Sequence, residues 1–403
     1  MEIINGGICA PKGYKANGIH CGIRRNRSKR DLALVVSETR AAAAGVYTQN
    51  LVKGAPITVT KKNIADGWAR AIICNSGNAN TCNANGIEIA EAMCDLVQQH
   101  TDIPASDVIV ASTGVIGEKL DITPIQNGMA ELVAGLGDHS ALATEAIMTT
   151  DTKPKEIAVS FVIGGVECRM GGIGKGSGMI HPNMATMLVF VTSDVAITPE
   201  MLQKALSEDV KTSFNMVSVD GDTSTNDTYT VMANGMAGNP VIDREGTDFD
   251  TFKAALSQVS RYLSRMIAGD GEGATKLLEC VVSGAADQDT AVIVSKSIIA
   301  SSLVKAAMFG SDANWGRVLC AIGYSGADID VNKVDVSFAS AAGTIDVCKD
   351  GAGIAFSEEL AKKILSEKEV QILVSLHGGS CSATAWGCDL TYDYVKINGD
   401  YRT

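Results

Sequence analysis

The sequence lacks the features that mark several classes of protein. Its 403 residues carry a net charge of −12, so we expect no clustered cationic face for a nucleic-acid backbone. No stretch approaches the ~20 consecutive apolar residues of a membrane-spanning helix. The first twenty residues show neither the basic start nor the apolar core of a signal peptide. We therefore expect a cytoplasmic protein with no nucleic-acid and no membrane partner.

Cysteines are present but form no pattern. The eleven cysteines are an odd number with irregular spacing, no two form a CxxC pair, and none has a histidine at zinc-ligand spacing. Such usage is typical of reduced thiols in a cytosolic protein. We expect no metal ion and no cofactor.

The composition predicts a globular protein built from strands and helices. Hydrophobic residues make up 46% and charged residues 20%, a balance that excludes a disordered chain, and the length suits two domains or one large α/β unit. Strand-like runs lie at 32–36, 57–61, 69–74, 107–111, 157–162, 166–170, 187–192, 370–376 and 381–395. The pair Gly164-Gly165 predicts a hairpin turn between two of these runs.

Helical periodicity alternates with these runs. It covers residues 86–100, 140–148, 199–212, 248–267, 290–308 and 357–367. Thr198 is a plausible N-cap with Pro199 behind it in the first helical position. Strands and helices interleave without a regular repeat. The expected fold class is α/β (α+β), with layered mixed sheets covered by helices.

The segment KGSGMIHPNMATML, residues 175–188, is the most informative part of the chain. A threonine hydroxyl is a weak nucleophile, and one route to its activation is a free α-amine on the same residue. Thr186 has such an amine only if the Ala185–Thr186 peptide bond is broken. Turn chemistry alone, however, favours an ordinary surface turn for this segment.

Several blocks of sequence resemble one family, the ornithine acetyltransferase (glutamate N-acetyltransferase) family of arginine biosynthesis. GKGSGMIHPNMATML resembles the family's self-cleavage segment. The other blocks, in chain order, are CNSGNAN (74–80), ASTGVIG (111–117), TTDT (149–152), SVDGDTSTND (218–227), GDGEGATK (269–276), GSDANWGR (310–317) and INGDYRT (397–403). They span nearly the whole chain, so the resemblance is specific.

The resemblance implies a self-cleaving N-terminal-threonine acyltransferase. Cleavage between Ala185 and Thr186 would give segments 1–185 and 186–403, which stay associated as a heterotetramer of two copies of each. Thr186 would accept the acetyl group of N-acetylornithine and pass it to glutamate in a ping-pong reaction. Its freed α-amine, with an ordinary pKa of ~7.7–8.0, suits a general base near neutral pH. Whether acetyl-CoA also serves as donor stays open.

The resemblance also assigns the remaining site residues. Thr113 and Gly114 would form the oxyanion hole, each donor worth roughly 3–4 kcal/mol of barrier. The substrate-binding positions would be Thr152, Lys175, Thr186, Glu272, Asn398 and Thr403. An ammonium such as that of Lys175 can hold a carboxylate, and a Glu272 carboxylate suits a cationic amine. A nucleotide-phosphate loop around Lys175 is disfavoured, because Arg169 stands where the template needs its first glycine.

Three alternatives follow from the same residues. The first is a hydrolase with the same Thr186 nucleophile and water as acceptor. The second is a binding protein with an intact chain that has lost its chemistry. The third makes His181 a catalytic base; we expect it instead to shape the loop, because a free α-amine makes a second base redundant.

Residues 220–227 do not fit a calcium loop, since they lack its sixth-position glycine. We expect a turn near the active site there.

Overall fold

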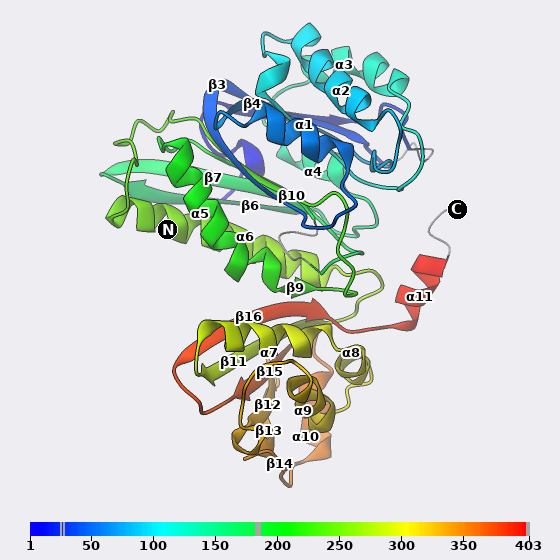
Figure 1. Ribbon diagram of the computed structural model, residues 1–403, viewed down its shortest axis with the longest axis vertical. Helices are drawn as coiled ribbons and strands as arrows, with labels where there is room; N and C mark the ends of the chain where they lie inside the picture. The colour runs from blue at the N-terminus through cyan, green and yellow to red at the C-terminus, as the bar shows by residue number, and fades with distance from the viewer. Residues whose placement is uncertain (25, 27–28, 182–186, 400–403) are drawn as a thin grey trace. The chain divides into compact units, whose positions relative to one another are not determined.

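Figure 1 shows a computed structural model of the chain, which describes residues 1–24, 26, 29–181 and 187–399. Within these residues the chain divides into two compact units, each with its own sheet. The first unit is built from Met1–Gly176, Pro182–Asn215 and Thr223–Leu263, and the second from Ser177–His181, Met216–Asp222 and Ser264–Thr403.

The sheet of the first unit mixes parallel and antiparallel pairs. Its strands are β1 (Glu2–Ile4), β2 (Tyr14–Ile19), β3 (Leu32–Tyr47), β4 (Trp68–Asn75), β5 (Val108–Ser112), β6 (Lys155–Ile163), β7 (Val166–Lys175), β8 (Leu188–Ser193) and β10 (Thr228–Ala233). They run in the order β1-β6-β7-β8-β10-β3-β4-β5, with β2 paired to β3 off this path. Both residues of the turn between β6 and β7, Gly164 and Gly165, have positive φ, which confirms the predicted hairpin.

Helices cover both faces of the β3–β5 end of this sheet (Figure 1). They are α1 (Ala55–Asn63), α2 (Gly86–His100), α3 (Thr123–Ala134) and α4 (Ser140–Ile147). Alternate strand residues point to opposite faces: Leu32 and Leu34 pack with α1, α2 and α3, whereas Ala33 and Val35 pack with α4. The continuous apolar runs in these strands follow from burial on both sides.

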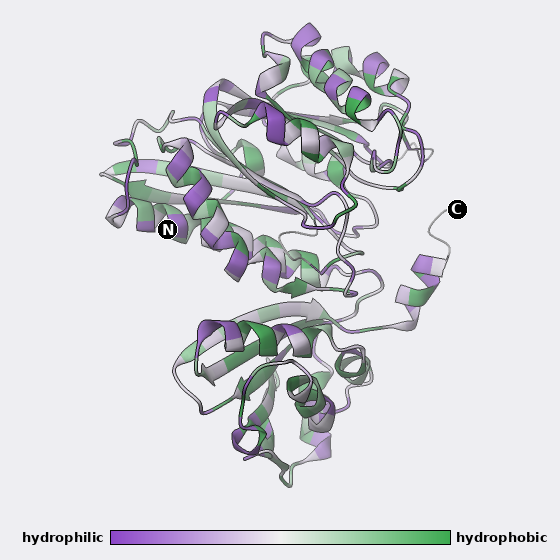
Figure 2. Ribbon diagram, in the orientation of Figure 1, coloured by the Kyte–Doolittle hydropathy of each residue, from purple (hydrophilic) through white to green (hydrophobic). Residues whose placement is uncertain are grey.

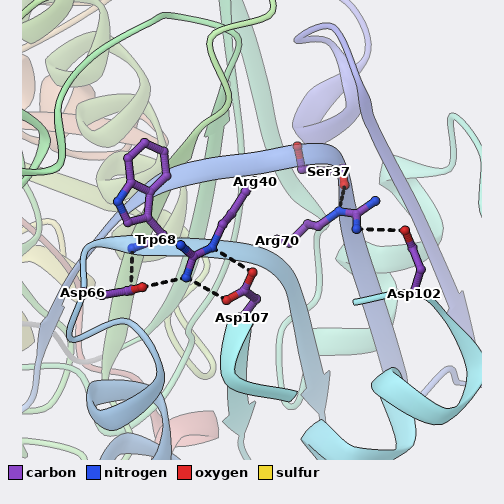
Figure 3. Close-up of polar contacts among 7 residues, drawn as sticks. All are labelled: Ser37, Arg40, Asp66, Trp68, Arg70, Asp102 and Asp107. Carbon is purple, nitrogen blue, oxygen red and sulfur yellow. Dashed lines mark hydrogen bonds and ion pairs between the residues drawn. The ribbon is translucent and has the colours of Figure 1, made fainter. Parts of the chain in front are cut away.

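A bulge in β3 is held by two arginines that form ion pairs (Figure 3). Arg40 donates to Asp66 at 2.6 Å and to both oxygens of Asp107 at 2.8 and 2.9 Å. Arg70 donates to Asp102 and to the carbonyl oxygens at positions 37 and 38. Those carbonyls belong to the bulged residues, which leave the regular ladder. The bulge lets one long strand pair with β2 and β4 first and with β10 further along.

Two further helices, α5 and α6, contribute to the first unit. α5 (Pro199–Thr212) begins at the predicted N-cap, since Thr198 Oγ1 accepts from the Met201 N–H. α6 (Thr247–Gly269) packs Val259 and Leu263 against Gly172 of β7. Its residues from Ser264 onward belong to the second unit. Figure 2 shows hydrophilic and hydrophobic residues interspersed along both helices, as expected of helices with one buried face.

The second unit has a separate sheet with helices packed on it. Its strands, in sheet order, are β14 (Ala352–Gly353), β13 (Gly343–Lys349), β12 (Asp335–Ser340), β15 (Glu369–Ser375), β11 (Leu277–Ala285), β16 (Cys381–Cys388) and β9 (Val217–Ser218). Its helices are α7 (Gln288–Ala300), α8 (Ser302–Phe309), α9 (Trp315–Gly323), α10 (Glu358–Leu365) and α11 (Tyr392–Gly399). Across both units, short 3-10 helices lie at Gly7–Cys9, Ala105–Asp107, Phe214–Met216 and Val331–Lys333. The expected layered α/β architecture is confirmed.

Three expectations for local structure are wrong. Residues 57–61 are helical in α1, because Thr60 exchanges hydrogen bonds with the N–H and carbonyl of Val110 and so covers the edge strand β5. The helix expected over 290–308 is two helices, bent by 56° where Ser301 caps α8. The last strand ends at Cys388, and α11 follows it.

Among the described residues, no single helix is long and apolar enough to cross a bilayer. α7 and α8 reach that length and composition only together, across their bend.

Candidate active site

Lys175 lies beside the described end of the cleavage segment. It is the last residue of β7 and pairs with Leu188, the first residue of β8. On the other side of Leu188, Thr228 of β10 donates its N–H to the Met187 carbonyl at 2.9 Å. Lys175 is nearly buried, at 8% exposure, and its ammonium donates to Thr113 Oγ1 at 3.4 Å. Residues 187 and 188 are held by the backbones of two neighbouring strands, one of which ends at Lys175.

Thr113 and Gly114 follow directly after β5 and offer two donors side by side. The Thr113 hydroxyl oxygen accepts from Lys175, so its own proton remains for another acceptor. The Val115 N–H donates to the Gly77 carbonyl at 3.3 Å, whereas the Gly114 N–H meets no acceptor among the described residues. Two adjacent donors without an acceptor among the described residues are one feature of an oxyanion hole.

Gly114 is a position where only glycine fits. Its φ is 131°, and a Cβ would lie 2.3 Å from the carbonyl carbon of Gly77 and 2.6 Å from the Asn78 nitrogen. The end of β5 is held from another side, because the Asn226 amide donates to the Ser112 carbonyl at 2.9 Å. Three of the sequence blocks that carry the family resemblance thus meet at this strand end.

Asp151 supplies the negative charge of this region. Its Oδ1 accepts from the Lys155 ammonium at 2.7 Å and from the Gly176 N–H at 2.8 Å, and its Oδ2 accepts from the Thr149 N–H at 2.9 Å. Burial by itself would raise the pKa of Asp151, but the charges of Lys175 and Lys155 outweigh it and hold the pKa well below its usual value. Burial lowers the pKa of Lys175, and the Asp151 charge opposes that shift. The carboxylate thus keeps two buried cations in place and fixes the first glycine after Lys175.

In the second unit, Glu272 and Asn398 are in contact. Asn398 of α11 donates its amide to Glu272 Oε2 at 2.8 Å. The first turn of α11 rests on the turn that carries Glu272: Thr391 donates its hydroxyl to the Gly273 carbonyl at 2.7 Å. Gly273 has φ 68°, and a Cβ there would lie 2.6 Å from the Tyr394 nitrogen. A glycine beside Glu272 is therefore needed for α11 to dock.

The start of the cleavage segment runs along this turn. The Glu272 N–H donates to the Ser177 carbonyl at 3.0 Å, and the Ser177 hydroxyl donates to the Asp270 carbonyl at 2.7 Å. A Cβ on Gly178 would lie 2.4 Å from the carboxyl carbon of Glu272. The Glu272 carboxylate, 7% exposed, thus lies directly against the backbone of the segment.

The following residues of the segment are held by Asp220. Its two oxygens accept the N–H groups of Met179 at 2.6 Å and Ile180 at 2.8 Å. Met179 has φ 57°, a left-handed conformation that costs a non-glycine residue roughly 1–2 kcal/mol. His181 Nδ1 lies 3.0 Å from Ser218 Oγ, and burial lowers the pKa of this histidine. These contacts are of the kind expected if His181 shapes the loop.

The structure brings some predicted site residues together and does not describe others. Thr152 is exposed and follows Asp151 directly. Ala185, Thr186 and Thr403 lie outside the described residues. The predicted residues that are in contact are Thr113 with Lys175 in the first unit and Glu272 with Asn398 in the second.

Sequence reasoning missed Asp151 and Asp220. Both lie in blocks that carry the family resemblance, TTDT and SVDGDTSTND, but each stands in a polar run that is typical of a surface turn. The available signals were that both blocks belong to the resemblance and that residues 220–227 were expected to form a turn near the active site, but neither aspartate was assigned a role. Only the fold reveals that Asp151 is buried and that Asp220 binds the cleavage segment.

Among the described residues, no group of three or more His, Cys, Asp or Glu side chains is placed to hold a metal ion. All eleven cysteines lie in the described part of the chain, and none of them is in a disulfide. The absence of a resident metal or cofactor stays a prediction.

Residues 15–403 match the model of the ArgJ family. The chain belongs to the ArgJ family. The arginine biosynthesis bifunctional protein ArgJ of Caldanaerobacter subterraneus subsp. tengcongensis is 50% identical over 405 aligned positions, which cover all of both chains. A crystal structure of the bifunctional protein argJ from Bacillus halodurans is 47% identical with a TM-score of 0.50; the match covers 52% of this chain and 97% of that one.

A third relative is the ornithine acetyltransferase of Mycobacterium tuberculosis, solved in complex with ornithine. It is 34% identical with a TM-score of 0.41, over 46% of this chain and 99% of that one. Membership of the ArgJ family confirms the resemblance inferred from the sequence blocks. It also confirms the expected enzyme class, an acyltransferase of arginine biosynthesis.

Proposed function

We propose that this ArgJ-family protein cuts itself between Ala185 and Thr186 and then uses Thr186 to move an acetyl group from N-acetylornithine to glutamate. Two adjacent donors, the Thr113 hydroxyl and the Gly114 N–H beside Lys175, carry this proposal. An acyl transfer passes through a tetrahedral oxyanion, and preorganised donors at a strand end stabilise it.

Self-cleavage begins with attack of the Thr186 hydroxyl on the Ala185 carbonyl. The peptide bond is replaced by an ester on the Thr186 oxygen, and the nitrogen of Thr186 becomes a free amine. Water then hydrolyses the ester, which releases the Ala185 carboxylate and restores the hydroxyl. The small side chain of Ala185 leaves room for the attack.

Acetyl transfer repeats this chemistry on a substrate. The Thr186 amine takes the hydroxyl proton as the oxygen attacks the acetyl carbonyl of N-acetylornithine. The oxyanion accepts from Thr113 and Gly114, and collapse returns the proton to the departing ornithine amine. The acetyl ester on Thr186 is then attacked by the amine of glutamate, and N-acetylglutamate leaves.

Each unit offers one charge that suits the substrates. In the first unit, the Lys175 ammonium is held by the protein and suits a substrate carboxylate. In the second unit, the Glu272 carboxylate, oriented by Asn398, suits a substrate ammonium. Thr152 and Thr403 complete the set of proposed substrate-binding residues.

The topology supports fragments that stay associated after cleavage. In the first sheet, β8 and β10 from segment 186–403 lie between β7 and β3 from segment 1–185. The two fragments therefore share one hydrogen-bonded ladder and one core. The solved Bacillus halodurans chain matches along 97% of its own length but only 52% of this chain, which is also consistent with relatives that exist as two pieces.

Finer aspects of the proposal follow the family. The bifunctional name of the relatives suits a second activity, acetylation of glutamate from acetyl-CoA as co-substrate. We expect a heterotetramer of two copies of each fragment, in the cytoplasm and without a resident cofactor. Light scattering of the purified protein would test the assembly.

The decisive experiment compares Thr186→Ala with the wild-type protein. The wild type should give two fragments by intact mass spectrometry and should convert N-acetylornithine and glutamate into ornithine and N-acetylglutamate. Thr186→Ala should give one uncut, inactive chain near 42.0 kDa. The matched control is Thr344→Ala, an exposed threonine of β13, which should cut and react normally.

The same assay separates the alternatives. Release of free acetate without N-acetylglutamate would mean a hydrolase, and an intact wild-type chain without turnover would mean a binding protein. Transfer activity retained in Thr186→Ala would remove Thr186 as nucleophile.

A further inference from the structure

The Asp220 carboxylate holds two successive residues of the cleavage segment within the second unit. Its two oxygens accept the N–H groups of Met179 and Ile180.

The contact with the segment has the geometry of a clamp. Two successive N–H groups point to the two oxygens of one carboxylate, and such charge-assisted hydrogen bonds are short and strong. Met179 needs such support, because its left-handed backbone is unfavourable for a residue with a side chain. The Asp220 side chain thus compensates for a strained residue that lies six positions before Ala185 in the sequence.

The held residues lie next to a proposed substrate-binding residue. Gly178, next to Met179, lies against the Glu272 carboxyl group, and Asn398 donates to Glu272 Oε2. A shift of the segment would therefore be transmitted to Glu272.

We propose that Asp220 is a positioning residue with two roles. It holds Met179 and Ile180 in the conformation from which the Ala185–Thr186 bond is cut, and it keeps the backbone of the segment against Glu272 for substrate binding afterwards. This inference rests on the proposed self-cleavage and transfer. In these reactions the Asp220 side chain contacts none of the reacting atoms.

The test measures cleavage and turnover separately. Asp220→Asn keeps the size of the side chain but replaces one acceptor oxygen with an amide donor, so one N–H of the segment loses its partner. Cleavage, followed as fragment appearance after in-vitro synthesis and scored only on soluble chains, should slow roughly 10-fold or more. Asp222→Asn is the matched control, an exposed acid of the same loop, and should cut at the wild-type rate.

The second role is tested on the cut fraction of Asp220→Asn. Its KM for N-acetylornithine should rise roughly 3- to 10-fold with kcat nearly unchanged, because the segment is held less firmly against Glu272. An unchanged KM would overturn the link between Asp220 and Glu272.

The outcomes separate this inference from the proposed function. If the wild type cuts but Asp220→Asn cuts equally fast, Asp220 does not position the segment, and the proposed function stands. If the wild type itself stays uncut, the proposed function fails, and this inference fails with it. If cleavage slowed equally in Asp220→Asn and Asp222→Asn, the effect would come from net charge. That result would also overturn the proposal that Asp220 holds the segment.

Discussion

The two groups of candidate site residues are built in opposite ways. Lys175 is nearly buried at the end of an interior strand, and its countercharge Asp151 is itself buried and bonded to Lys155. Glu272 is also nearly buried, but its partner Asn398 stands on the exposed helix α11 close to the chain end. The first group is fixed by a sheet and by charge, and the second by a turn and a short helix.

The two groups differ in how much free energy the loss of one member costs. A buried ion pair tolerates no loss of one member, because the remaining charge stays without water or partner. A hydrogen bond on an exposed helix can be replaced by water at small cost. We therefore expect loss of the shared countercharge Asp151 to affect folding and activity together, and changes around α11 to affect substrate binding alone.

The largest effect should come from Asp151→Ala. It leaves the Lys155 ammonium, 0% exposed, without its countercharge, and breaking such a buried pair costs about 3–5 kcal/mol. The melting temperature should fall sharply and the soluble yield with it. As control, Glu91→Ala removes the exposed partner of Lys62 and should change stability by less than about 1 kcal/mol. Equal melting temperatures for the two variants would contradict the comparison.

Lys175→Ala should give the next largest effect, on activity more than on stability. Asp151 keeps Lys155 as its partner, so the fold should persist, while a substrate carboxylate loses a charged hydrogen bond. We expect kcat/KM to fall roughly 100-fold, measured by steady-state kinetics on the folded variant. A fall of less than about threefold would remove Lys175 from substrate binding.

Asn398→Ala should have a smaller effect confined to KM. The Glu272 carboxylate stays in place through its turn but loses one donor from α11. A rise in the KM for N-acetylornithine of roughly 3- to 10-fold is expected, with cleavage and melting temperature as in the wild type. Loss of folding in this variant would show that α11 is part of the structural core.

The smallest effect is a pH dependence that belongs only to the first group. Burial lowers the pKa of Lys175 below its ordinary value, so the ammonium loses its proton at a lower pH than an exposed lysine does. The inhibition constant of N-acetylglutamate, which carries no titratable amine, should therefore rise as the pH increases toward 10. Asn398→Ala should give the same profile, whereas Lys175→Ala should give a flat one. A wild-type constant independent of pH would exclude Lys175 as the carboxylate partner.

Local patterns predicted much of the fold. The helix over 86–100, the helix over 199–212 and the hairpin at Gly164-Gly165 lie where the sequence predicts them. Periodicity and capping are local, so short stretches suffice. The prediction of a strand at 57–61 was wrong. The β-branched residues there favour a strand, whereas burial against β5 makes the segment helical.

In the candidate site, too, some features depend on local sequence and others depend on tertiary packing. The sequence by itself determined the family and the glycines that tight turns require, because these depend on residues close together in the chain or on blocks in a fixed order. That Thr186 is freed by cleavage stays a prediction. Only the tertiary structure decided that Asp151 is the buried countercharge of Lys155 and Lys175, and that Asp220 holds the cleavage segment. Those contacts join residues up to 41 positions apart, and the Glu272–Asn398 contact joins residues 126 apart. Burial and charge at such distances are set by packing, which no local pattern contains.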